Sequence, residues 1–306
     1  MGRKRQRGRN VNGILLLDKA VGMTSNAALQ EVKKLYNAKK AGHTGSLDPL
    51  ASGLLPLCMG EATKLSAFLL DADKVYEGVC QLGSKTSTGD AEGEVIETRP
   101  VPAFDEASLK KIFSQFMGEI EQIPPMHSAI KKNGQPLYKL AHKGIEVERE
   151  PRQVHIYELI VLEIHESSFK FRLHCSKGTY VRTLVEDIGE VLGCGAYLTD
   201  LRRIQVGPFQ LEDAVSPEEL AHVAADQGFE GLDKLMIPMD KALESWPAVH
   251  LTENSTYYVR QGQPVQVAKA PTSGWVRLFA SNDSFIGVGQ ILDDGRVAPK
   301  RLLNVG

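Results

Sequence analysis

Hydrophobic and polar residues alternate strictly from Phe169 to Cys175. This pattern predicts a half-buried strand, because successive side chains of a strand point to opposite faces of its sheet. β-Branched and apolar runs predict further strands at residues 14–17, 75–82 and 154–164. A substantial part of the chain is therefore expected to form a sheet.

Other stretches repeat apolar residues at helical spacing. Leu184, Val185, Ile188 and Leu192 fall on one face of a helix, and Gly193 follows them as its expected C-cap. Further helices are predicted over residues 29–36 behind Thr24-Ser25-Asn26, over residues 109–116 with Gly118 closing them, and from the capping box Ser216-Pro217-Glu218-Glu219.

The pattern changes at about residue 250. Short strands are predicted at 275–279, 285–292 and 296–303, with turn signals between them. We therefore expect a small β domain at 249–306 behind a larger domain at 11–248. Within the larger domain, residues 124–152 are rich in Pro, Gly and Lys and predict an excursion from the core. Residues 1–10 predict a flexible basic arm, whose charge fits RNA contact and a disordered tail equally well.

The composition is that of a globular protein, with 42% hydrophobic and 24% charged residues. No apolar run is long enough to span a bilayer, and the N-terminus lacks the features of a signal peptide. The net charge of −2 is not typical of a general nucleic-acid binder. Basic residues nevertheless gather in two regions, which fits one specific RNA and ordinary surface charge equally well. These residues are Lys131, Lys132, Lys139, His142, Lys143, Arg149 and Arg152, and then Lys177, Arg182, Arg202 and Arg203.

The cysteines and the absent motifs limit the chemistry. Cys58, Cys80, Cys175 and Cys194 show no C-x-x-C spacing, so free buried thiols in a reducing cytoplasm are expected rather than a metal site. The run Gly83–Gly89 has the wrong spacing for a phosphate loop, and no dinucleotide fingerprint or nucleophile elbow is present. We therefore expect no cofactor.

The segment Gly42–Pro56 holds one acid, Asp48, in an otherwise uncharged stretch rich in Gly, Pro and Leu. The leucines predict apolar surroundings, in which a carboxylate is costly unless it is used or neutralised. Taken alone, Asp before Pro is more typical of a turn. The length and glycine content of the segment favour a catalytic acid or nucleophile instead.

A second cluster could supply the cation that such a carboxylate requires. The run Ser176–Arg182 follows the alternating strand and precedes the helix that ends at Gly193. Strand-to-helix junctions often carry site residues on a rigid scaffold. For each basic residue by itself, the ordinary interpretation is a solvated side chain beside a turn.

These stretches resemble the signatures of the TruB family of tRNA pseudouridine synthases. The resemblance covers about residues 11–205 and continues more weakly to the C-terminus. Ala20 stands where the family usually has Pro, which loosens a turn but removes no chemistry. The matching segments are Asn12–Lys19, Gly42–Pro56, Gly60–Lys64, Pro124–Lys131 and Lys177–Arg182.

The resemblance implies an α+β fold with a mixed, largely antiparallel sheet of the pseudouridine synthase type. A small C-terminal all-β PUA-like RNA-binding domain would follow. The implied activity is isomerisation of uridine to pseudouridine in the T-loop of tRNA, at position 55, on a flipped-out base. The enzyme would be a cytoplasmic monomer that binds the T-arm of tRNA and uses no cofactor, metal or membrane.

The resemblance also implies roles for individual residues. Asp48 would be the catalytic carboxylate. Arg182 would pair with it and keep it ionised, because a close cation lowers a carboxylate pKa by roughly 1–3 units. Tyr76 would stack on the uracil, and Tyr180 and Leu201 would line its pocket. His43 would enter the space vacated in the RNA, and Asp90 would orient the substrate or close the loop 86–93. Residues 124–152 would grip the RNA. Core packing is the plain alternative for Tyr76, Tyr180 and Leu201, and a satisfied loop histidine for His43.

Two other classes of protein stay open. A non-catalytic RNA-binding or RNA-chaperone module would not need a carboxylate beside phosphates, so Asp48 counts against it. A hydrolase acting on nucleosides usually needs a second positioned acid or a metal, and no acid neighbours Asp48 in its motif. Isomerisation changes the nucleoside while the mass of the RNA stays unchanged, whereas hydrolysis releases uracil and binding does neither.

Overall fold

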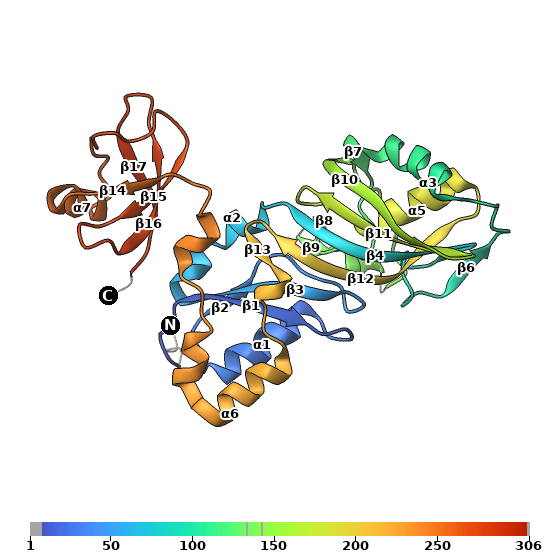
Figure 1. The fold of residues 1–306 in the computed structure, drawn as a ribbon, viewed down its shortest axis with the longest axis horizontal. Helices are drawn as coiled ribbons and strands as arrows, with labels where there is room; N and C mark the ends of the chain where they lie inside the picture. The colour runs from blue at the N-terminus through green and yellow to red at the C-terminus, as the bar shows by residue number, and fades with distance from the viewer. Residues whose placement is uncertain (1–7, 133, 142, 305–306) are drawn as a thin grey trace. The chain divides into compact units, whose positions relative to one another are not determined.

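The computed structural model describes residues 8–132, 134–141 and 143–304. They form two compact units (Figure 1). Unit 2 consists of Asp48–Gly53 and Asp71–Gln205, and unit 1 contains the described residues up to Leu47, Leu54–Leu70 and the chain from Val206 onward. The chain thus enters unit 2 at Asp48, returns after Gly53 and enters it again at Asp71. The domain boundaries expected from the sequence stay a prediction.

Unit 2 is built on one sheet in the order β12-β4-β11-β10-β7. The pairs β4–β11, β11–β10 and β10–β7 are antiparallel. At the other edge, β12 pairs in parallel with Ser52 and Gly53, the first residues of β3. The predicted mixed, largely antiparallel sheet is confirmed. The bounds are Ser52–Met59 for β3, Lys74–Leu82 for β4, Gly118–Gln122 for β7, Arg152–Ile164 for β10, Ser168–Cys175 for β11 and Ala196–Val206 for β12.

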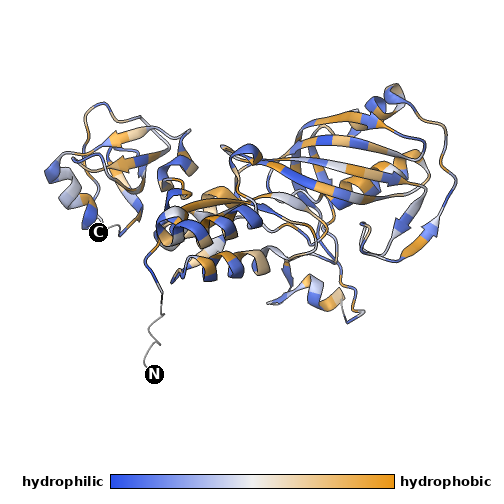
Figure 2. Cartoon of the chain, turned by 60° about the horizontal axis from the view of Figure 1, so that its bottom comes forward, coloured by the Kyte–Doolittle hydropathy of each residue, from blue (hydrophilic) through white to orange (hydrophobic). Residues whose placement is uncertain are grey.

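The alternation of β11 buries one of its faces under the helices of unit 2. Figure 2 shows orange and blue residues alternating along these strands, and Phe169 and Phe171 are almost fully buried. Helix α3 (Glu106–Phe113) contacts both β10 and α5 (Val181–Leu192), and the ring of Phe113 lies 5.7 Å from that of Phe169. Gly193 ends α5 at a φ of 81°, as predicted.

One predicted helix of unit 2 differs in the structure, and the predicted excursion contains short elements. The helix expected up to Gly118 ends at Phe113, a 3-10 turn at Ser114–Phe116 follows, and Gly118 starts β7 with a φ of 81°. Residues 124–152 contain a short hairpin and one helical turn, with exposed lysines on β8. His142 lies outside the described residues. The bounds are Ser84–Thr86 for β5, Val95–Thr98 for β6, Lys131–Lys132 for β8, Gln135–Pro136 for β9 and Leu137–Ala141 for α4.

Unit 1 pairs β3 with β1 and β2 and packs helices against them. Helix α1 begins after Thr24, whose side chain accepts a hydrogen bond from the backbone N–H of Ala27. The bounds are Gly13–Lys19 for β1, Ala41–His43 for β2, Ser25–Leu35 for α1, Ser66–Leu70 for α2, Phe209–Gln210 for β13 and Pro217–Lys234 for α6, with 3-10 turns at Gly60–Lys64, Leu211–Asp213 and Met239–Leu243. Strand β1 also forms a hydrogen bond with a residue distant in sequence, because the N–H of Ile14 donates to the carbonyl of Ile237 at 3.0 Å.

Most of the expected basic arm lies outside the described residues, but Arg9 is an ordered part of unit 1. Its backbone exchanges hydrogen bonds with Asn37 and Lys39. Its guanidinium pairs with Asp233 and lies 4.2 Å from the centre of the Phe229 ring. A cation over an aromatic face is attracted by the ring quadrupole, so the root of the arm is fixed on α6.

The C-terminal part of unit 1 contains a four-stranded sheet in the order β14-β15-β16-β17. The three predicted short strands are present, and β14 adds a parallel strand at the edge. The segment also contains a helix, α7, that the turn pattern did not predict. The bounds are Ala248–His250 for β14, Glu253–Arg260 for α7, Trp275–Phe279 for β15, Phe285–Ile291 for β16 and Val297–Leu302 for β17. No helix within the described ranges is long and apolar enough to cross a membrane.

Candidate active site

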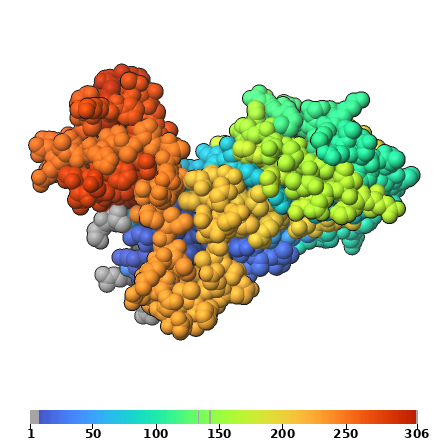
Figure 3. Space-filling model, in the orientation of Figure 1, coloured from blue at the N-terminus to red at the C-terminus, as the bar shows by residue number. Residues whose placement is uncertain are grey.

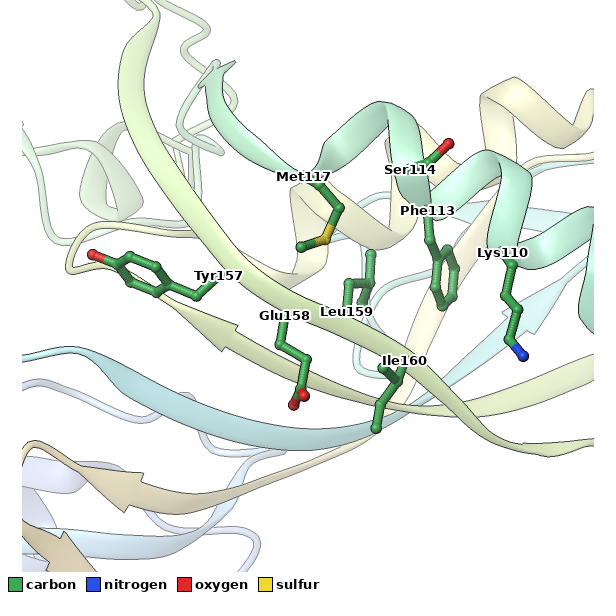
Figure 4. A pocket seen from close by; sticks show the side chains of 8 residues that line it. All are labelled: Lys110, Phe113, Ser114, Met117, Tyr157, Glu158, Leu159 and Ile160. Carbon is green, nitrogen blue, oxygen red and sulfur yellow. The ribbon is translucent and has the colours of Figure 1, made fainter.

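A pocket in unit 2 lies between α3 and β10 (Figure 4). Its lining residues are Lys110, Phe113, Ser114, Met117, Tyr157, Glu158, Leu159 and Ile160. None of them belongs to the motifs that predict chemistry. Figure 3 shows the yellow-green segment that carries β10 on the surface of unit 2, so this pocket is a surface feature, and the candidate site must be built from the motifs instead.

The Asp48 carboxylate forms the predicted ion pair with Arg182, with 2.9 Å between Oδ2 and the guanidinium nitrogen. The expectation of a buried carboxylate is wrong, because the Asp48 side chain is 46% exposed. The reason lies in the path of the chain. Leu47 and Leu54 are buried within unit 1, whereas the chain enters unit 2 at Asp48 and leaves the acid open to solvent. A substrate can therefore reach it.

Gly53 ends this excursion at a place where only glycine fits. Its φ is +98°, and an added Cβ would lie 2.3 Å from the backbone oxygen of Arg203 on β12. Any larger side chain would force the two strands apart. The close approach holds the loop that carries Asp48 against β12, on which Leu201 is 7% exposed beside the Arg202–Ser52 pair.

The Arg182 guanidinium is almost fully buried and has four partners. Besides Asp48, it contacts Asp90 Oδ2 at 3.3 Å. It also donates hydrogen bonds to the carbonyls of Thr88 at 2.9 Å and His127 at 2.8 Å. Since the planar fork directs donors along fixed lines, these contacts fix where the cation meets Asp48. The second carboxylate, Asp90, was not anticipated as a partner of Arg182.

Asp90 lies in the loop between β5 and β6, and its role towards the substrate stays a prediction. Its side chain is 3% exposed and accepts hydrogen bonds from the Thr88 hydroxyl and from the backbone N–H of Glu92. The N–H of Ala91 bonds the carbonyl of Leu198 on β12 at 2.9 Å. The loop is thereby pinned, and it presents both a carboxylate and a carbonyl to Arg182.

Both predicted tyrosines belong to the surroundings of Asp48. Burial raises the pKa of the Tyr76 hydroxyl, while a hydrogen bond to Arg203 opposes the shift. Burial also raises the pKa of the Tyr180 hydroxyl. The charge of Asp48 makes a lesser contribution that also raises the pKa of both hydroxyls. Both tyrosines belong to unit 2, as Asp48 does, and an aromatic ring can stack on a planar substrate.

His43 is the one predicted site residue that belongs to unit 1. It ends β2 opposite Leu57 of β3. The other predicted residues, namely Asp48, Tyr76, Asp90, Tyr180, Arg182 and Leu201, all belong to unit 2. The insertion of His43 into RNA stays a prediction.

The cysteines are buried, and burial disfavours their thiolate form. All four are free and buried, as expected, and burial raises the pKa of the Cys58 thiol to about 12. Within the part of the chain that the structure describes, no group of three or more His, Cys, Asp and Glu side chains could hold a metal ion.

Sequence reasoning missed Gln122, the last residue of β7. Its side chain is almost fully buried and bonds the backbone of Tyr180, which precedes α5. A glutamine before two prolines gives no sign of this contact, because its partner lies 58 residues along the chain.

Comparison with known families gives matches along most of the chain. Residues 33–181 match the TruB family pseudouridylate synthase N-terminal domain. Residues 182–244 match the tRNA pseudouridylate synthase B C-terminal domain, and residues 247–303 match the C-terminal domain of pseudouridine synthase II TruB.

Individual proteins are similar over nearly their whole length. A tRNA pseudouridine synthase B of Nitrosococcus oceani is 55% identical, over 98% of this chain and 97% of the relative. The protein of that name from Ectopseudomonas mendocina is 56% identical, over 97% of each chain.

Solved structures share the fold. A chain in a crystal structure of a Cbf5-Nop10-Gar1 complex has a TM-score of 0.73 and 27% identity, covering 95% of this chain and 84% of its own. A chain in an H/ACA RNP bound to a substrate RNA containing 2'-deoxyuridine also has a TM-score of 0.73, at 24% identity, covering 99% of this chain and 92% of its own.

Proposed function

Because this chain belongs to the TruB family of pseudouridine synthases, we propose that it isomerises uridine 55 in the T-loop of tRNA, with Asp48 as the acting carboxylate. The chain is a pseudouridine synthase, and its full-length relatives are named as tRNA enzymes. The T-loop position and the role of Asp48 are the proposal. The observation that carries it is an accessible carboxylate held by a buried arginine, with two tyrosines whose hydroxyl pKa its charge helps to raise.

The reaction breaks the bond between N1 of uracil and C1′ of the ribose, turns the base, and joins C5 to C1′. C5 loses its hydrogen to water as a proton and N1 gains a proton, so the composition of the RNA is unchanged and no electron is transferred overall. The base must first leave its stack, which costs a few kcal/mol. The protein therefore has to bind an extruded nucleotide and act on it with its own groups.

Asp48 can reach a substrate because almost half of its side chain is open. Its carboxylate could attack C1′, add to C6 of the base or remove a proton from the sugar. In each route the reacting oxygen must be held in place, and Arg182 does this through its contact with Oδ2. Asp90 and two backbone carbonyls hold Arg182 in turn.

The other residues would hold the RNA. Tyr76 would stack on the flipped uracil, and Tyr180 and Leu201 would line the pocket around it. His43 would occupy the space that the base leaves. The exposed lysines of residues 124–152 would contact phosphates of the T-arm. We further propose that the protein works as a monomer in the cytoplasm.

The decisive experiment replaces Asp48 by Asn, which keeps the shape and removes the charge. We expect release of tritium from 5-tritiated uridine in tRNA to fall below detection, with tRNA affinity changed little. The matched control is Asp71→Asn, since Asp71 is another exposed carboxylate in unit 2, paired with Lys177 at 2.8 Å. That variant should turn over like the wild type.

The same assay separates the alternatives. Wild-type protein should place pseudouridine at position 55, read by nucleoside analysis of the mapped T-loop fragment. Residual turnover by Asp48→Asn, with contamination excluded, would remove Asp48 from catalysis. Pseudouridine at another position would overturn the T-loop assignment, and release of free uracil would indicate hydrolysis.

A further inference from the structure

Gln122 is a buried polar side chain for which the reaction described above has no use. It ends β7, pairs in register with Arg152 of β10, and is 2% exposed. Burying an amide costs free energy unless its donor and acceptor are both satisfied. The partners of this amide should therefore reveal its role.

Both partners of the Gln122 amide belong to the backbone of one residue. The Tyr180 N–H donates to Gln122 Oε1 at 3.0 Å, and Gln122 Nε2 donates to the Tyr180 carbonyl at 3.3 Å. The glutamine thus imitates a neighbouring strand and clamps Tyr180 from both sides. The Tyr180 carbonyl also accepts the N–H of Leu184, the first bond of α5.

Tyr180 is the N-cap of α5, and its side chain makes no capping hydrogen bond. The preceding residues turn through Gly178, which has a φ of 81°, and the Thr179 hydroxyl bonds the Ser176 carbonyl at 3.0 Å. The clamp from Gln122 therefore fixes the backbone from which α5 starts. Arg182 lies two residues further on, within the first turn of that helix.

The same segment contacts Arg182 a second time. Five residues after Gln122, the His127 carbonyl accepts a hydrogen bond from the Arg182 guanidinium at 2.8 Å. Residues 122–127 thus hold the backbone before Arg182 and the end of its side chain. A shift of Tyr180 would move both the ring expected beside the uracil and the cation that holds Asp48.

We propose that Gln122 is a positioning residue for the pseudouridine synthase reaction, acting through Tyr180 and Arg182 to set the Asp48 carboxylate. The inference rests on the proposed role of Asp48. Misplacement of a reacting group by about 1 Å can cost about a hundredfold in rate. Because Gln122 is buried behind the start of α5, its loss should affect the chemical step and leave tRNA binding almost unchanged.

The test is the replacement Gln122→Met, which keeps the length of the side chain and removes both hydrogen bonds. The single-turnover rate constant at saturating tRNA should fall by about 10- to 100-fold. The tRNA dissociation constant from filter binding should change by less than about twofold. Gln122→Asn is the second variant, because its shorter amide cannot span both backbone groups and leaves less risk of misfolding.

The matched control is Gln81 at the far end of β4. Its amide also donates to backbone carbonyls, those of Ser167 at 2.9 Å and Leu82 at 3.2 Å. Gln81→Met and Gln81→Asn should lower the melting temperature as the Gln122 variants do, yet keep the wild-type rate. A merely structural Gln122 would give the same result as Gln81.

The outcomes are distinct. A wild-type rate for folded Gln122 variants, or equal losses for Gln122 and Gln81 variants, would overturn the positioning role. Weaker tRNA binding with an unchanged rate would overturn it too. If the wild-type protein itself formed no pseudouridine, the proposed function would fail, and this failure would be seen in the wild type before any Gln122 variant is compared.

Discussion

Replacement of Arg182 by Met should destabilise the protein because it strands a buried charge. Asp90 would keep its carboxylate at 3% exposure without the cation that faces it at 3.3 Å. The carbonyls of Thr88 and His127 would each lose a charged donor. The Asp48 side chain is 46% exposed and can be solvated by water, so its unpaired charge should add little to the loss of stability.

The magnitude follows from these contacts. Removing one partner of a buried ion pair costs about 3–5 kcal/mol, mainly for the charge that remains. The two carbonyls share the same cation, so their loss does not simply add to this figure. We therefore expect the free energy of unfolding of Arg182→Met to fall by about 3–5 kcal/mol relative to the wild type.

Urea unfolding of the wild type, of Arg182→Met and of a double variant measures this effect. The double variant, Arg182→Met with Asp90→Asn, replaces the stranded carboxylate by a neutral amide and should recover about 2 kcal/mol of the lost free energy of unfolding. Neither variant should turn over. Arg182→Lys keeps a cation but loses the planar fork, so it should retain more stability than Met while its turnover stays strongly impaired.

Two results would refute this reasoning. If Arg182→Met unfolded within about 1 kcal/mol of the wild type, the carboxylate of Asp90 would not be a stranded buried charge. If the double variant were no more stable than the single one, the cost would come from packing instead of charge. Wild-type turnover by Arg182→Lys would show that the geometry of the guanidinium is unnecessary.

Two further predictions concern RNA binding and pH. Replacing the exposed Lys131, Lys132 and Lys143 together by Gln should weaken tRNA binding, while the rate at saturating RNA stays unchanged. The salt dependence of binding should flatten by roughly one unit of slope for each phosphate that is no longer neutralised. An unchanged slope in filter binding would mean that these lysines do not contact RNA. Burial raises the pKa of Asp187 to about 6, so the stabilisation that this group gives as a neutral acid is lost as pH rises from 4 through 6. Asp187→Asn should accordingly be more stable than the wild type at neutral pH, by about 1 kcal/mol because solvent screens this partly exposed group, and show no gain near pH 4; parallel unfolding curves against pH would contradict this.

The sequence allowed the prediction of features that depend on local pattern. The strand over Phe169–Cys175 and the helix capped by Gly193 follow from side-chain period and backbone preference. The Asp48–Arg182 pair was predicted from two motifs and a family resemblance. The pairing of Arg182 with Asp90 and the clamp of Gln122 on Tyr180 could not be foreseen, because loop and strand must first assemble around α5.

The exposure of Asp48 shows a second limit. Hydrophobic neighbours in sequence suggested a buried acid, yet Leu47 and Leu54 are buried as residues of unit 1 while the chain enters unit 2 between them. Apolar neighbours in sequence predict the burial of a residue only when they pack in the same unit as that residue. Asp48 does not meet this condition, because the chain passes from unit 1 to unit 2 at this residue.

The long-range bond of β1 has a consequence for how the protein is made. Strand β1 emerges early from the ribosome, but Ile14 finds its partner at Ile237, and Asp18 finds its partner at Val215. At about 5–20 residues per second, synthesis of the intervening chain takes roughly 10–40 seconds. During that time β1 can pair with β3 and pack against α1, but its bonds to Ile237 and Val215 cannot form, while the unbroken stretch Asp71–Gln205 of unit 2 is already available to fold. The order of synthesis thus allows unit 2 to complete its fold before unit 1, which needs the chain from Val206 onward.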